Sequence, residues 1–139
     1  MKAITIHQPW ASLIACGVKQ IETRSWATKY RGKIAIHAGI KQMPRDCYGI
    51  RDLFPDTCDF PYGKVIAIAD LVDCLQVQET RENTHGNWFA VLENRTVDGN
   101  ELLFGNYDVG RYAWILKNVK PINPVPAKGM QRLWEWEGP

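Results

Sequence analysis

The stretch HQPWASLIACGVKQIETRSW, from His7 to Trp26, decides the fold prediction. Pro9 suits the first position of a helix, because its missing N–H would be unpaired there in any residue. The apolar residues that follow recur at i, i+3 and i+4, the spacing of a buried helix face, and are Trp10, Leu13 and Ile14. Gly17 predicts the end of the helix, because glycine adopts the left-handed conformation at little cost. The sequence therefore predicts a short helix over residues 9–16.

A charged segment follows this helix and is the first candidate site. Lys19, Glu22 and Arg24 come in quick succession, and residues 20–26 are predicted to form a strand. On an extended strand Glu22 and Arg24 point to the same side, so an ion pair between them is one interpretation. A ligand site is the other, because the planar fork of arginine suits phosphate and a carboxylate accepts hydrogen bonds from base amino groups.

Composition predicts an ordinary globular domain. The 139 residues are 45% hydrophobic and 23% charged, which suits a single domain over residues 1–139. No apolar run reaches the roughly 18 residues of a membrane span, and the first residues do not resemble a signal peptide. We therefore expect a cytoplasmic protein with no membrane partner.

Cysteine spacing gives no metal site, because none of the four forms a C-x-x-C pair (Cys16, Cys47, Cys58 and Cys74). We expect four free thiols that pack as small apolar groups. No phosphate-binding glycine loop, Ser-His-Asp arrangement or metal-ligand cluster is present in the sequence, so no cofactor and no metal are predicted. His37 ends a strand, and a hydrogen-bonded structural histidine is the favoured interpretation.

Charge is distributed unevenly along the chain. Residues 1–51 hold nine Lys or Arg and two acidic residues, a net charge of +7, whereas residues 52–116 hold four and eleven, a net charge of −7. This asymmetry indicates either a face that binds polyanions or two halves that complement each other's charge.

The rest of the chain reads as short strands separated by turns. Strands are predicted over residues 3–6, 32–37, 64–73, 111–118 and 133–136, and short helices over residues 45–53 and 88–94. A turn is predicted at Asp98–Gly99, and the prolines after residue 120 indicate an extended edge. The predicted fold class is α+β, a small mixed β-barrel with short α-helices at its rim.

These residues also carry a family resemblance. The chain resembles an ASCH domain, a branch of the PUA-like superfamily. The matching motifs are QPWASLI (8–14), GVKQIETRSW (17–26), RGKIAIH (31–37), GKVIAIADLVD (63–73), GRYAWIL (110–116) and PVPAKGMQRLW (124–134). The resemblance implies a PUA-like barrel with a cleft beside the first helix and the strand that follows it. It also implies RNA binding as the main function.

A second function is implied by small enzymatic members of the family, the bacterial N4-acetylcytidine amidohydrolases. Their lysine corresponds to Lys19, and their threonine falls on Glu22, with Thr23 adjacent. Their distal glutamate corresponds best to Glu93. A lysine in a semi-buried cleft can act as a base, and a carboxylate can activate water or protonate the leaving amine. The alternative function is therefore a cofactor-free amidohydrolase that acts on an acylated nucleoside, with Lys19, Glu22 and Glu93 as catalytic residues.

RNA, or a modified nucleoside, is the predicted partner. Basic residues would contact phosphates and aromatic residues would stack on bases. The residues assigned to nucleic-acid contact are Gln8, Arg24, Trp26, Lys29, Tyr30, Arg31, Lys33 and Lys128. Trp10 is expected in the core rather than at the surface. A third interpretation is an interaction domain that exposes Trp134 and Trp136, which are otherwise expected to close the core.

Overall fold

A computed structural model describes residues 1–139. Strands and short helices alternate along the chain. Their bounds are β1 (Lys2–Ile6), α1 (Trp10–Ala15), β2 (Ile21–Arg24), β3 (Gly32–Ala38), η1 (Cys47–Gly49), η2 (Arg51–Leu53), β4 (Lys64–Glu82), β5 (Trp88–Leu92), β6 (Thr96–Val97), α2 (Gly99–Leu103), β7 (Tyr112–Pro126) and β8 (Leu133–Glu135). None of the helices is long and apolar enough to cross a bilayer.

One sheet contains all the strands. Its order is β2-β7-β4-β3-β1-β8, with β5 attached to β4 and β6 attached to β5. β1 runs parallel to β3, and β8 pairs antiparallel with β1. The α+β class with a dominant sheet is therefore confirmed. The order ends at β2 and β8 without closing, so the predicted closed barrel is not observed in these pairings.

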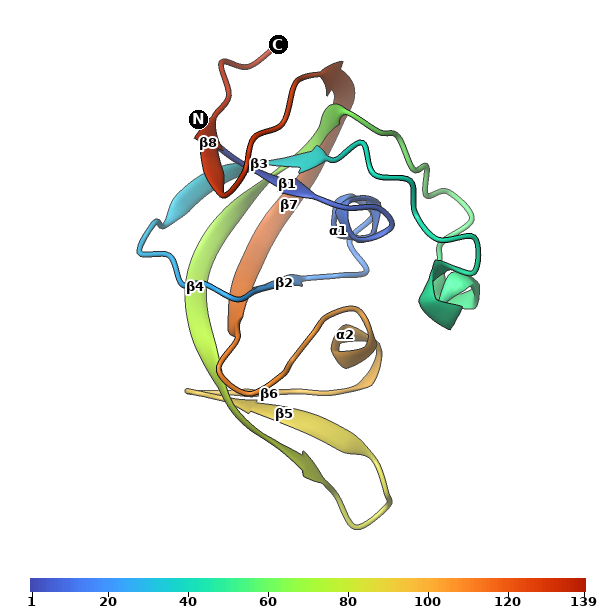
Figure 1. The fold of residues 1–139 in the computed structure, drawn as a ribbon, viewed down its shortest axis with the longest axis vertical. Helices are drawn as coiled ribbons and strands as arrows, with labels where there is room; N and C mark the ends of the chain where they lie inside the picture. Colours follow the sequence, from blue (N-terminus) through green and yellow to red (C-terminus); the bar gives the residue numbers. More distant parts are fainter. The chain divides into compact units, whose positions relative to one another are not determined.

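The chain divides into two compact units. The first unit comprises Met1–Lys19, Gly32–Asp70 and Lys117–Pro139, and the second comprises Gln20–Arg31 and Leu71–Leu116. In the first unit α1 lies beside β3, and the N-terminal amine donates to the carbonyl oxygen of Trp136 at 3.0 Å. In the second unit α2 packs beside β5 (Figure 1). A single domain over residues 1–139 stays a prediction.

Helix α1 confirms the predicted helix with shorter bounds, Trp10–Ala15 instead of residues 9–16, and with Trp10 only half-buried on its predicted apolar face. Pro9 is the N-cap residue, Leu13 and Ile14 are fully buried, and the N–H of Gly17 donates to the carbonyl oxygen of Ile14 at 3.0 Å. Gly17 has φ +83°, a conformation that favours glycine. The N–H of Lys19 returns to the carbonyl oxygen of Leu13 at 3.1 Å, and this closes the turn that leads into β2.

The predicted helix over residues 88–94 is wrong. Residues Trp88–Leu92 form strand β5, antiparallel to β4. Along β5 Ala90 and Leu92 are buried while Phe89 and Val91 are half-buried, which is the two-residue alternation of a strand. Pairing with β4 satisfies the backbone, so tertiary context overrides the short helical spacing. The helix of this region, α2, begins after Asp98, where the sequence predicts only a turn.

The other elements differ from prediction mainly in length. β4 continues nine residues past its predicted end at Asp73, with a bulge between Val77 and Glu79. β7 extends through the three prolines, which confirms their extended conformation, although β7 lies between β2 and β4 in the sheet order. The predicted helix over residues 45–53 is two short 3₁₀ helices, η1 and η2.

The prediction of four free thiols is wrong for two of them. Cys16, which follows α1, and Cys58 form a disulfide whose Cα atoms are 6.0 Å apart, whereas Cys47 and Cys74 are free. A spacing of 42 residues gives no local signal, because only the fold brings the end of α1 beside the loop before β4.

Candidate nucleic-acid interface

Glu22 and Arg24 form an ion pair on β2. The Arg24 guanidinium contacts Glu22 Oε2 through Nε at 3.1 Å and Nη2 at 2.9 Å. Both side chains are largely shielded, with 11% and 23% of their surface exposed. Glu22 lies opposite Trp114 of β7, and Arg24 lies opposite Tyr112. The ion pair predicted from the strand period is confirmed, and it fixes the direction of the arginine fork.

Thr23 is the hydroxyl-bearing neighbour of Glu22, and its side chain points to the face of β2 opposite to that of Glu22. Its Oγ1 accepts a hydrogen bond from the N–H of Asn106 at 3.1 Å, and its carbonyl oxygen accepts one from Arg111 Nη2 at 3.4 Å. A Cβ on Gly105 would lie 3.3 Å from this hydroxyl. Thr23 is therefore part of the packed side of the strand, away from the side that holds Glu22.

Tyr107 lies in the apolar core of the second unit and is a residue that sequence reasoning missed. It is 5% exposed, and its hydroxyl has no hydrogen-bond partner. Burial raises the pKa of Tyr107 far above its usual value, and the carboxylates of Glu101 and Glu22 raise it further. The hydroxyl therefore keeps its proton at every physiological pH. No motif surrounds Tyr107 that could have marked it.

The segment from Trp26 to Arg31, called here the basic aromatic loop, follows β2 directly. Trp26 packs edge-on against Trp114 with ring centroids 4.7 Å apart, and Trp114 Nε1 donates to the Trp26 carbonyl oxygen at 3.3 Å. Lys29 and Arg31 are exposed, and Tyr30 is half-buried. The loop thus joins two cations and two aromatic rings in six residues.

Hydrogen bonds hold this loop in one conformation. The N–H of Tyr30 donates to Thr28 Oγ1 at 3.1 Å. Arg31 Nη1 donates to the carbonyl oxygens of Thr28 and Tyr30, each at 2.9 Å, and Arg31 Nη2 lies 3.7 Å from Asp73 Oδ1. Arg31 therefore shapes the loop as well as contributing charge.

Four predicted site residues belong to the first unit, and side-chain hydrogen bonds within that unit engage two of them, Gln8 and Lys33. Lys19 is 1% exposed and Gln8 is 1% exposed. Gln8 Nε2 donates to Ser12 Oγ at 2.6 Å and to the Pro61 carbonyl oxygen at 2.8 Å, which uses both amide hydrogens. Lys33 Nζ donates to Asp70 Oδ1 at 3.0 Å. Lys128 is exposed and lies between Ala127 and Gly129, two residues that lie close to His37.

His37 is the structural histidine that the sequence predicts. Its Nε2 lies 2.8 Å from the Ala127 carbonyl oxygen, and its Nδ1 lies 3.1 Å from Thr5 Oγ1. Trp134 packs edge-on against its ring at 5.5 Å. Burial lowers the pKa of His37, and the hydrogen bond to Ala127 opposes this in part. Enclosure of His37 therefore favours the neutral form of its ring.

The remaining predicted residues are not part of the basic aromatic loop. Glu93 follows β5 in the second unit, where its Oε1 accepts a hydrogen bond from the N–H of Gln76 at 2.9 Å. Trp134 and Trp136 are 8% and 7% exposed and belong to the core of the first unit, so an exposed partner surface made by them is wrong. Trp10 is half-buried and stacks on Tyr48 at 5.3 Å.

Comparison with known proteins identifies the family. The ASCH domain model matches residues 4–126, so this chain belongs to the ASCH domain family. The chain is similar to activating signal cointegrator 1 of Homo sapiens and of Mus musculus, with 36% identity over 90 residues in each case. The match covers 57% of this chain, and it spans 15% of the length of each relative.

Proposed function

We propose that this ASCH-domain chain binds single-stranded RNA through the basic aromatic loop and the Glu22–Arg24 pair. The observation that carries the proposal is the loop itself, where exposed Lys29 and Arg31 alternate with Trp26 and Tyr30 in a hydrogen-bonded conformation. Cations that neutralise phosphates supply affinity, and aromatic rings accept unpaired bases by stacking. An ordered loop loses less conformational entropy on binding than a mobile one.

We propose that the Glu22–Arg24 pair orients the bound RNA and contributes little to the overall affinity. Its partial burial lowers the dielectric around the guanidinium and strengthens any hydrogen bond it makes. The Glu22 carboxylate accepts hydrogen bonds, so it suits a base amino group, while the arginine fork suits a phosphate or a guanine edge. Both partners lie on one side of β2, directly before the loop.

The test is the salt dependence of RNA binding by Lys29→Ala. Lys29 is exposed, so its loss leaves the fold intact, and the affinity for a single-stranded oligonucleotide should fall. The slope of log K against log salt concentration should become smaller by about one, because one phosphate contact is lost. Fluorescence anisotropy over a range of salt concentrations measures both quantities.

Lys117→Ala is the matched control, since Lys117 is an exposed lysine of the first unit with no proposed contact. It should leave the salt slope unchanged. An equal decrease in both variants would mean that binding depends only on net charge. That result, or an absence of RNA binding by the unaltered protein, would overturn the proposal.

A second candidate function, hydrolysis of an acylated nucleoside such as N4-acetylcytidine, is favoured by one observation. Lys19 is 1% exposed, although an ammonium group is costly to remove from water. Removal from water disfavours the charged form of a lysine, and a lysine that loses its proton near neutral pH can act as a base. In this candidate function Lys19 acts as the base.

Lys19→Met tests this candidate function while preserving the length and packing of the side chain. Release of cytidine from N4-acetylcytidine should fall about 100-fold or more in kcat, the usual contribution of a general base. Circular dichroism would establish that the variant is folded. Lys117→Met should keep full turnover, and an unaltered protein that releases no cytidine excludes this candidate function.

A further inference from the structure

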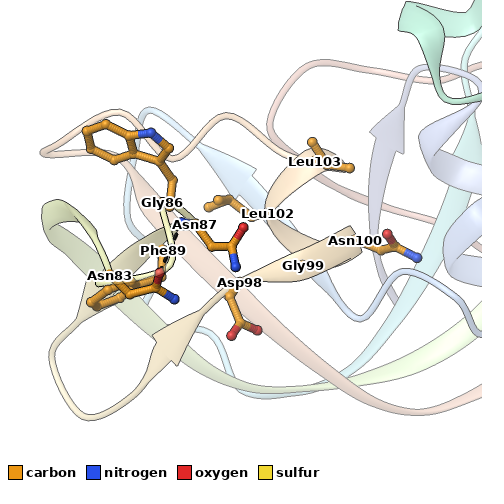
Figure 2. A pocket seen from close by; sticks show the side chains of 10 residues that line it. Asn83, Gly86, Asn87, Phe89, Asp98, Gly99, Asn100, Leu102 and Leu103 are labelled. Carbon is orange, nitrogen blue, oxygen red and sulfur yellow. Dashed lines mark hydrogen bonds between the residues drawn. The ribbon is translucent and has the colours of Figure 1, made fainter.

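The second unit also contains a pocket. Its lining residues come from the segment 83–103 and do not belong to the basic aromatic loop. It has a volume of about 630 Å³, within the usual range of small-molecule sites. The turn between β4 and β5 forms one side, and the start of α2 forms the other (Figure 2).

The lining combines exposed apolar surface with uncharged amides. Trp88 is 55% exposed and Leu103 is 59% exposed, while Phe89 and Leu102 are half-buried. Large apolar side chains exposed together beside polar groups mark a binding site more often than isolated ones do. The pocket therefore suits a ligand with a flat apolar face.

The polar groups differ in how far the fold uses them. Asn83 Oδ1 accepts hydrogen bonds from the N–H groups of His85 at 2.9 Å and Asn87 at 3.0 Å, so Asn83 shapes the turn. Asn87 and Asn100 are exposed, and each amide can both donate and accept. Asp98 occupies the N-cap position of α2, but its carboxylate makes no capping hydrogen bond.

Charge decides which ligand the pocket suits. None of its lining residues is Lys or Arg, and its one ionised side chain is Asp98. Such a lining offers no charge-assisted contact to a phosphate. A ligand that is apolar on its faces and polar but uncharged at its edge fits this lining, and a nucleobase has both properties.

We propose that this pocket binds an unpaired nucleobase, preferentially one with an exocyclic amino group. Trp88 stacks on the base, the amide of Asn87 contacts its edge, and the Asp98 carboxylate accepts the amino group. The proposal rests on the proposed RNA binding and deepens it, because the pocket would read a base of a strand whose phosphates contact the basic loop. A free nucleoside has the same chemistry and is the other source.

The experiment uses the full chain with four free nucleosides and with short single-stranded RNAs of one base each. Binding is measured by calorimetry. Cytidine and adenosine should bind more tightly than uridine. Trp88→Ala should weaken their binding about tenfold, since stacking on one base contributes that much or more, and Trp88→Phe should retain most of it.

Two further variants separate the pocket from the fold. Asp98→Asn keeps a good N-cap residue, so α2 should persist while the preference for cytidine over uridine is lost. Val109→Ala removes an equally exposed apolar side chain outside the pocket and should change nothing. Equal binding of all four nucleosides by the unaltered protein, or unchanged affinity in Trp88→Ala, would overturn the proposal.

Failure here can be distinguished from failure of the proposed RNA binding. If the pocket proposal fails alone, RNA binds with the salt slope that depends on Lys29, and Trp88→Ala has no effect on any oligonucleotide. If RNA binding fails alone, nucleosides bind and depend on Trp88, but no oligonucleotide binds more tightly than its nucleoside. The single-base RNAs also report whether the base is read within a strand or only when free.

Discussion

Each unit buries a polar ring, His37 in the first and Tyr107 in the second, and the two rings differ in how their polar atoms are hydrogen-bonded. In the first unit, the polar atoms of His37, Thr5 and Trp134 are connected by hydrogen bonds. In the second unit, the hydroxyl of Tyr107 is buried without a partner. A buried polar group that lacks a partner costs free energy, whereas a satisfied network rigidifies its surroundings. The comparison indicates that the hydrogen-bonded His37 site stabilises the first unit, whereas the Tyr107 hydroxyl destabilises the second.

Hydrogen-bond chemistry assigns the proton positions around His37. The Ala127 carbonyl oxygen can only accept, so His37 Nε2 carries the proton. In the neutral ring Nδ1 then accepts, and the Thr5 hydroxyl donates to it. Thr5 Oγ1 in turn accepts from Trp134 Nε1 at 3.1 Å. One tautomer therefore satisfies all three side chains.

Gly129→Ala should have the largest effect on stability. The added methyl group would clash with the hydrogen-bonded side chains of His37 and Thr5. A Cβ at this position would lie 2.6 Å from Thr5 Oγ1 and 2.7 Å from His37 Cε1, closer than atoms can approach. We expect the free energy of unfolding to fall by about 1–3 kcal/mol, the usual cost of overpacking. Urea denaturation measures it. Lys128→Ala, at the exposed neighbour, should stay within about 0.5 kcal/mol, and similar losses in both variants would contradict the packing argument.

Tyr107→Phe should have a smaller effect of opposite sign. Removing the unpartnered hydroxyl removes its desolvation cost, so the free energy of unfolding should rise by about 1 kcal/mol. Thermal and urea denaturation would show it. Tyr62→Phe is the informative counterpart, because the Tyr62 hydroxyl accepts a hydrogen bond from the N–H of Met43 at 3.2 Å. Destabilisation by both substitutions would mean that the Tyr107 hydroxyl has a partner in solution.

The smallest expected effect is a dependence of stability on pH, since the Ala127 hydrogen bond offsets part of the burial effect on His37. The folded pKa of His37 lies below its ordinary value of 6.5, so the unfolded chain binds the proton more readily. Stability is complete above pH 6.5 and falls as the pH decreases from there toward the folded pKa. Urea denaturation at pH 7.5 and pH 5.5 measures the loss, and His37→Gln should remove it. A loss of equal size in that variant would assign it to other groups.

Regular local patterns were predicted well from the sequence. Helix α1 and its glycine end follow from residues that are neighbours in the chain, and so does the shared side of Glu22 and Arg24 on β2. These features depend on backbone periodicity and on the conformational freedom of Gly17, and both act over a few residues.

Features that depend on distant partners could not be predicted in this way. The sequence of strand β5 fits a helical spacing, and only its pairing with β4 makes it a strand. The Cys16–Cys58 disulfide joins residues 42 positions apart. The pocket beside Trp88 likewise combines a turn with the start of α2. Short windows of sequence carry no information about which segments will meet.

The sequence by itself determined the sheet-rich α+β class, the family resemblance and the charged segment around Glu22 and Arg24, because periodicity and motif are properties of contiguous residues. The tertiary structure alone decided that Lys19 is buried, that Tyr107 lacks a partner and that Trp88 is exposed beside polar side chains. Burial and hydrogen-bond satisfaction are set by which distant segments pack around a side chain, so they exist only once the chain has folded.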